Sequence, residues 1–130
     1  MAFRVHLLAV PNTQTTAAFP LDGFVVRTML FAELLKAMGA TVYLYGVANN
    51  EAPCDEFISC MTEVEQKNFI GATPNQSVQF DLSPVFVTFN TRSNWAIRER
   101  KQPGDYLCTI AGTSQQQCSE QHPELPFVEY

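Results

Sequence analysis

The sequence contains little charge, and positive charge is the scarcer sign. Charged residues make up 16% of the 130 residues, and eight Lys and Arg oppose 13 Asp and Glu, which leaves a net charge of −5. Binding to a phosphate backbone needs a basic face, so this balance argues against a nucleic-acid partner.

Long apolar stretches are also missing. The longest candidate is interrupted by Arg27, Glu33 and Lys36, so no segment reaches the length of a transmembrane helix. Arg4 near the N-terminus is followed by no long apolar segment, which argues against a signal peptide. We therefore expect a cytoplasmic location and no integral membrane segment.

Cysteine motifs are absent, because none of the four cysteines belongs to a Cys-x-x-Cys pair. Cys108 lies in an apolar run, which favours a small buried thiol. Cys118 and His122 are four residues apart and could share a helix face as metal ligands. Two ligands do not make a site, and Pro123 ends that helix at once, so we expect no metal.

Motifs for cofactor binding and nucleophilic catalysis are missing too. The chain has no Walker loop, no Gly-x-Gly-x-x-Gly fingerprint and no supported Ser-His-Asp set, so we expect neither NAD nor FAD nor another cofactor. One of the two histidines, His6, lies inside an apolar run and is interpreted as a satisfied core residue rather than a base.

The most informative segment that is present is a β-α-β pattern near the N-terminus. Residues 5–10 form an apolar run of strand length that ends at Pro11, residues 24–38 read as a helix that Gly39 ends, and residues 41–45 read as the next strand. Open α/β sheets bind ligands at the carboxyl ends of their strands, beside helix N-termini. The long turn at 11–23 is therefore the first candidate site.

The rest of the chain continues the same alternation. Residues 55–61 predict a strand, and residues 62–70 predict a helix that Thr62 and Glu65 begin as a capping box. Residues 84–101 have β propensity at their start, but the apolar positions fall on one helical face, so we expect a helix. Further expected elements are a strand at 105–111, a short helix at 114–121 and a strand at 126–130. The prediction is one α/β domain over residues 1–130, a Rossmann-like open parallel sheet of about five strands in the order 3-2-1-4-5, flanked by helices.

The first turn supplies the first candidate binding residues, Asp22, Gly23 and Phe24. Free N–H groups at the following helix start favour an anion or a sugar hydroxyl, and Gly23 would let the chain approach a ligand closely. The other interpretation is a plain turn glycine with Asp22 as the helix cap.

Five further positions complete the candidate site. Arg27 is predicted on the same side of its helix as Leu30, Phe31 and Leu34, facing the sheet, either as a clamp on a phosphate or carboxylate or as a snorkelling cation paired with an Asp. Asn90 lies in a polar stretch that also contains Arg92 and Asn94. Gly112, Gln115 and Gln116 follow the fourth strand, where they could bind sugar hydroxyls or face solvent.

Several motifs, in this order and spacing, resemble the N-terminal domain of nucleotide-sugar-dependent glycosyltransferases of the GT-B architecture. They are Val-Pro-Asn-Thr-x-Thr at 10–15, Asp-Gly-Phe at 22–24, Leu-Leu-Lys-x-Met-Gly at 34–39 and Val-x-Leu-Tyr-Gly at 42–46. The runs at 50–56, 89–92, 100–105 and 110–115 resemble one bacterial and phage branch of this family. Ala40 departs from the pattern, because the family often has His after the glycine that precedes the second strand.

The resemblance implies the acceptor-side domain of an enzyme that transfers a sugar from a nucleotide-sugar donor to an acceptor hydroxyl. In that family a second, C-terminal domain holds the donor, and these 130 residues do not include it, so we expect no transferase turnover from the chain alone. No catalytic residue is assigned. The alternative is a non-catalytic, truncated α/β module that binds a nucleotide or sugar, or that forms a homodimer through an exposed sheet edge.

Overall fold

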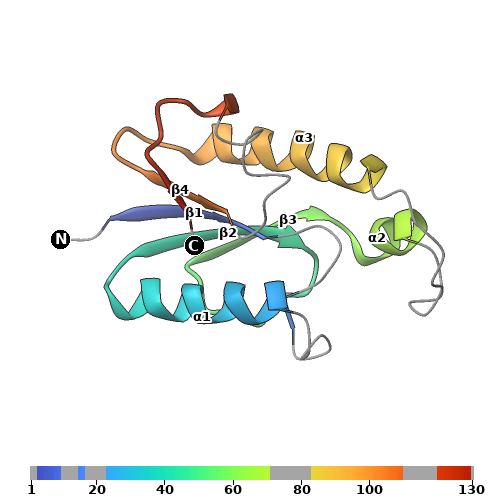
Figure 1. Ribbon diagram of the computed structural model, residues 1–130, viewed down its shortest axis with the longest axis horizontal. Helices are drawn as coiled ribbons and strands as arrows, with labels where there is room; N and C mark the ends of the chain where they lie inside the picture. The colour runs from blue at the N-terminus through green and yellow to red at the C-terminus, as the bar shows by residue number, and fades with distance from the viewer. Residues whose placement is uncertain (1–2, 10–14, 17–22, 71–82, 110–119, 130) are drawn as a thin grey trace.

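The computed structural model describes residues 3–9, 15–16, 23–70, 83–109 and 120–129 (Figure 1). Its centre is a sheet of five parallel strands in the order β3-β2-β1-β4-β5, which confirms the predicted fold class and strand order. The strands are β1 (Arg4–Leu8), β2 (Thr41–Val47), β3 (Glu56–Met61), β4 (Tyr106–Thr109) and β5 (Phe127–Glu129). The helices are α1 (Gly23–Ala37), α2 (Glu63–Ile70) and α3 (Ser83–Arg100).

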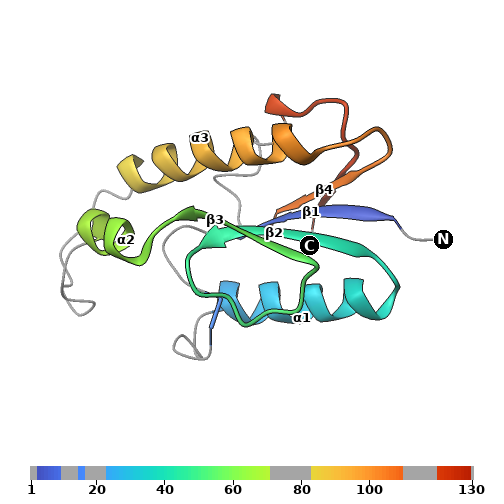
Figure 2. The same cartoon turned by 180° about the vertical axis from the view of Figure 1, so that it is seen from behind.

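The sheet lies between two helical layers, with α1 on one face and α3 on the other (Figures 1 and 2). Alternate strand residues point to opposite faces, so each strand contributes side chains to the packing against both helical layers. On the α1 side Leu7 and Leu44 pack with Leu35 of the helix. On the α3 side Leu8 and Leu107 belong to a cluster that also contains Phe89 and Ile97 of α3.

Helix ends follow the signals in the sequence. Gly39 has a φ of 83°, and the N–H groups of Gly39 and Ala40 donate to the carbonyls of Lys36 and Leu35, which is the Schellman pattern that closes α1. The capping box of α2 is present, because Thr62 and Glu65 exchange backbone-to-side-chain hydrogen bonds of 3.1 Å each. The expected helix over 84–101 is confirmed as α3.

The connection from β2 to β3 contains no helix, although parallel strands are usually joined by one. Residues 48–55 instead run along the α1 side of the sheet, where Ala52 and Cys54 join the α1-side core cluster. Asn50 Oδ1 accepts the N–H of Ala52, and Asp55 Oδ2 accepts the N–H of Val42 at 2.7 Å and a proton of Lys36 at 2.8 Å. These local contacts hold a short segment where a crossover helix would otherwise lie.

The prediction of which side of α1 faces the sheet is wrong. The buried positions are Val25, Thr28, Ala32 and Leu35. Of the residues predicted to face the sheet, Phe31 is half-buried against the core, whereas Leu30 and Leu34 are 53% and 50% exposed. The cause is composition: α1 is apolar on nearly all sides, so its hydrophobic pattern does not single out one face. Within the described ranges, no helix combines the length and apolar character needed to span a bilayer.

Candidate functional site at the carboxyl edge of the sheet

The strand order reverses direction between β1 and β4. The chain goes from β1 outward to β2 and β3, then returns through α3 to β4 on the other side of β1. The two strands are in register, with Leu8 opposite Thr109, so their carboxyl ends lie next to each other. In open α/β sheets this reversal point is where ligands bind, because the segments leaving the two strands diverge and open a crevice.

Two helices begin at the same edge. Figure 1 shows α1 and α3 starting at the end of the molecule toward which the central strands point. Gly23 is the first residue of α1, and the first backbone N–H groups of a helix have no partner within the helix. They carry partial positive charge and favour an anion or a hydroxyl oxygen.

The segment that leaves β1 is held against the segment that leaves β2. Thr15 and Thr16 are 6% and 7% exposed, and the carbonyl of Thr15 accepts the N–H of Glu51 at 2.8 Å. The connections after β1 and β2 therefore meet at the carboxyl edge, which gives the site a wall on the α1 side.

Thr109, the last residue of β4, is the residue at this edge that sequence reasoning missed. It is 2% exposed, and its hydroxyl has no hydrogen-bond partner among the described residues. A buried hydroxyl without a partner costs free energy, and such a group needs an explanation. The signal in the sequence was a polar residue inside an otherwise apolar run, but only the register with β1 places it at the reversal point.

The predicted site residues fall into three groups. Gly23 and Phe24 are the first two residues of α1 and lie at the carboxyl edge. Asp22, Gly112, Gln115 and Gln116 lie outside the described residues, as does Cys118 of the rejected metal pair.

The remaining two lie on helices. Arg27 is exposed in the first half of α1, so the prediction that it faces the sheet is wrong for the reason given for Leu30 and Leu34, and its binding role stays a prediction. Asn90 is 7% exposed on α3 and lines a cavity with α3 neighbours and the helical residues 120–121, and its binding role also stays a prediction.

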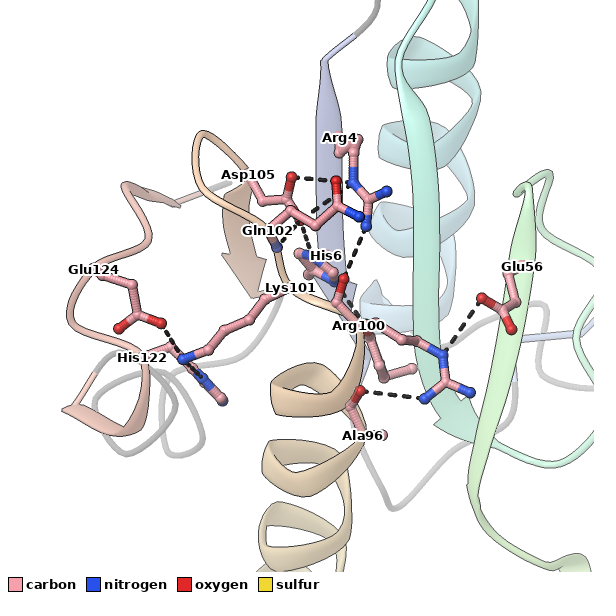
Figure 3. Close-up of polar contacts among 11 residues, drawn as sticks. Arg4, His6, Glu56, Ala96, Arg100, Lys101, Gln102, Asp105, His122 and Glu124 are labelled. Atoms are coloured by element: carbon pink, nitrogen blue, oxygen red, sulfur yellow. Dashed lines mark hydrogen bonds and ion pairs between the residues drawn. The ribbon is translucent and has the colours of Figure 1, made fainter.

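The main buried polar cluster lies near the opposite, amino edge of the sheet, around His6 (Figure 3). His6 is 0% exposed, and its Nε2 lies 2.6 Å from Asp105 Oδ2 while its Nδ1 lies 2.7 Å from the Tyr45 hydroxyl. The carboxylate can only accept, so Nε2 carries the proton and Nδ1 accepts from Tyr45. Arg4 adds a charged contact to Asp105 at 3.1 Å and also donates to the carbonyl of Arg100 at the end of α3.

This cluster is structural rather than catalytic. Burial lowers the pKa of His6, and the hydrogen bond that it donates to Asp105 opposes this shift without reversing it. Burial also raises the pKa of Tyr45. Both groups therefore stay neutral, and neither is reached by solvent. The expectation that His6 is a satisfied core residue is confirmed.

Two of the three described cysteines are buried, and burial raises the pKa of the Cys60 and Cys108 thiols to about 12, so neither forms a thiolate near neutral pH. The third, Cys54, is half-buried, and burial also raises the pKa of its thiol. The buried position expected for Cys108 is confirmed. In the part of the chain that the structure describes, no group of three or more His, Cys, Asp and Glu side chains could hold a metal ion.

No protein-family model matches this chain, and no curated protein matches it either. The functional conclusion therefore depends on the fold, the carboxyl edge and the sequence motifs.

Proposed function

We propose that this chain is the acceptor-side domain of a nucleotide-sugar-dependent glycosyltransferase, and that a sugar acceptor binds at the carboxyl edge between β1 and β4. The observation that carries the proposal is the reversal of strand order at that edge, with Leu8 and Thr109 in register. Because β1 and β4 are parallel neighbours, the motifs at 10–15 and 110–115 follow adjacent strands along the sequence.

The chemistry at this edge suits a neutral hydroxyl-rich ligand better than a charged one. The α1 start offers backbone N–H donors on one face of the sheet, and Thr109, on the α3 face like Leu107, adds a buried hydroxyl without a partner among the described residues. The first half of α1 carries one cation, the exposed Arg27, and Arg4 is engaged at the opposite edge. In such enzymes, catalysis consists mainly of stabilising charge on the leaving diphosphate and removing the acceptor proton. The role proposed for this chain is to hold the acceptor.

Binding can be followed on the ¹⁵N-labelled chain by NMR, with simple sugars and UDP added in separate titrations. We expect a sugar to shift the amide resonances of Ala9, Gly23 and Thr109, and UDP to leave them unchanged. Thr109→Val removes the buried hydroxyl and should weaken that response. Thr41→Val, at the amino end of β2, is the matched control and should not.

Two outcomes would overturn this proposal. One is a saturable response of the edge amides to UDP with none to any sugar, which would favour the nucleotide-binding module instead. The other is equal loss of sugar response in Thr109→Val and Thr41→Val, which would mean that the Thr109 hydroxyl has no special place in binding.

A second candidate function, self-association, is favoured by one specific observation. The outward side of α1 carries several large apolar side chains beside the exposed Arg27 and Glu33: Val26, Leu30, Leu34 and, one residue past the helix end, Met38 are each between 42% and 58% exposed. Groups of exposed apolar side chains mark protein–protein contact surfaces. Sedimentation of the chain at micromolar concentration tests this candidate. A clean monomer, unchanged in the double variant Leu30→Gln and Leu34→Gln, would reject it.

A further inference from the structure

A cavity of about 390 Å³ lies along one flank of α3. Val87, Thr91, Asn94 and Arg98 recur every three or four residues and form one stripe of the helix, and Gln121 lies on the opposite wall. The volume falls within the usual range for small-molecule sites.

Two asparagines line this cavity, Asn90, which is buried, and Asn94, which is half-buried. The Asn94 Oδ1 atom itself is shielded from solvent and has no hydrogen-bond partner among the described residues, so the rest of the side-chain amide is what faces the cavity. The Thr91 hydroxyl, in contrast, donates to the carbonyl of Val87 at 2.9 Å.

One wall of the cavity is a large aromatic ring. Trp95, the one tryptophan of the chain, is 58% exposed, which is unusual for such a large apolar side chain. The Arg98 guanidinium lies 5.0 Å from the centre of its ring and also reaches Gln121 Oε1 at 3.5 Å. Arg98 therefore joins the two walls and fixes the position of the indole.

The charges that line the cavity balance. Arg98 and Glu120 both line it, and the remaining lining residues are uncharged. A phosphate or carboxylate would meet one cation, already engaged with Trp95 and Gln121, and one opposing anion. The lining therefore suits a neutral ligand with an apolar face and several hydroxyl groups.

We propose that this cavity binds a neutral pyranose, with a ring hydroxyl hydrogen-bonded to the Asn94 side-chain amide and the C–H face of the sugar against Trp95. The site uses residues of α3 and the helical residues 120–121, and it does not rest on the glycosyltransferase proposal. A sugar at the β1–β4 edge and a sugar in this cavity are reported by different residues, so either proposal can fail while the other stands.

Trp95 makes the test direct, because all tryptophan fluorescence of the chain comes from the proposed site. The probes are the methyl glycosides of glucose, galactose and N-acetylglucosamine, with glycerol as the acyclic polyol control. We expect at least one glycoside to change the emission saturably, with a dissociation constant on the order of 1 mM. Asn94→Ala keeps the reporter and should weaken binding about tenfold.

The matched control is Glu99→Gln, which changes an exposed α3 residue outside the cavity and should bind as the parent does. If Asn94→Ala does not fold, Val87→Arg blocks the cavity from a position that is 60% exposed and should abolish the response. Three results would overturn the proposal: no glycoside response, a response to glycerol of equal size, or a saturable response to UMP or inorganic phosphate alone.

Discussion

At the scale of single residues, the structure depends most on Asp105. This carboxylate is 2% exposed and accepts from His6 Nε2 at 2.6 Å, from Arg4 and from the backbone N–H of Gln102 at 2.9 Å. It therefore ties β1 to the turn that precedes β4 and satisfies a buried imidazole. Buried charges are tolerated only when they are paired and hydrogen-bonded, and this one is.

We expect Asp105→Asn to lower the free energy of unfolding by about 3 kcal/mol, because it leaves Arg4 without its countercharge and disturbs the hydrogen bond to His6. Urea unfolding measures this change. Glu56→Gln is the control: Glu56 is 48% exposed and meets Arg100 at 3.4 Å, so its loss should cost about 1 kcal/mol or less. Equal costs in the two variants would show that the His6 cluster does not stabilise the fold.

At the scale of elements, local signals in the sequence were sufficient where the physics is local. The α2 capping box and the Gly39 stop depend on contacts within a few residues, and both formed as predicted. The side of α1 that faces the sheet was not predictable in this way. Leu34 and Leu35 are equally apolar, and which of them is buried depends on how the whole helix docks on the sheet.

Leu34 and Leu35 form a natural pair for testing this correction. Leu35 is 5% exposed and packs in the α1-side core, whereas Leu34 is 50% exposed. Leu35→Ala should lower the free energy of unfolding by about 3 kcal/mol through lost burial and the remaining cavity. Leu34→Ala should change it by about 0.5 kcal/mol or less. The reverse order, measured by urea unfolding at low protein concentration, would restore the originally predicted face.

At the scale of the whole molecule, the strand order was predictable because right-handed connections and buried strands permit few arrangements. The site was predictable only in part. Gly23 and Phe24 follow from the rule that helices begin at the carboxyl edge, whereas Thr109 required the β1–β4 register and Trp95 required knowledge of which α3 flank stays open. Asp22 and the 112–116 positions remain predictions.

The free energy of unfolding should also depend on pH through the two buried histidines. Burial lowers the pKa of His6, and burial together with Lys101 lowers that of His122 to about 4. Lys101 donates to His122 Nδ1 at 3.2 Å, an arrangement that fits only a neutral ring. In the unfolded chain both imidazoles titrate near pH 6.5, so below that pH the unfolded state binds more protons than the folded state does.

Stability should therefore be full above about pH 6.5 and fall as the pH drops toward 4, with His122 alone accounting for about 3 kcal/mol. Carboxylates whose pKa values are lowered, such as Glu65 at about 2, also stabilise the folded state, and this contribution is lost only at lower pH. Urea unfolding measured between about pH 7 and 4.5 thus isolates the histidines. His122→Gln keeps an acceptor for Lys101 but cannot titrate, so its profile should be flatter. A variant profile parallel to that of the parent chain would mean that His122 does not titrate differently in the folded and unfolded states.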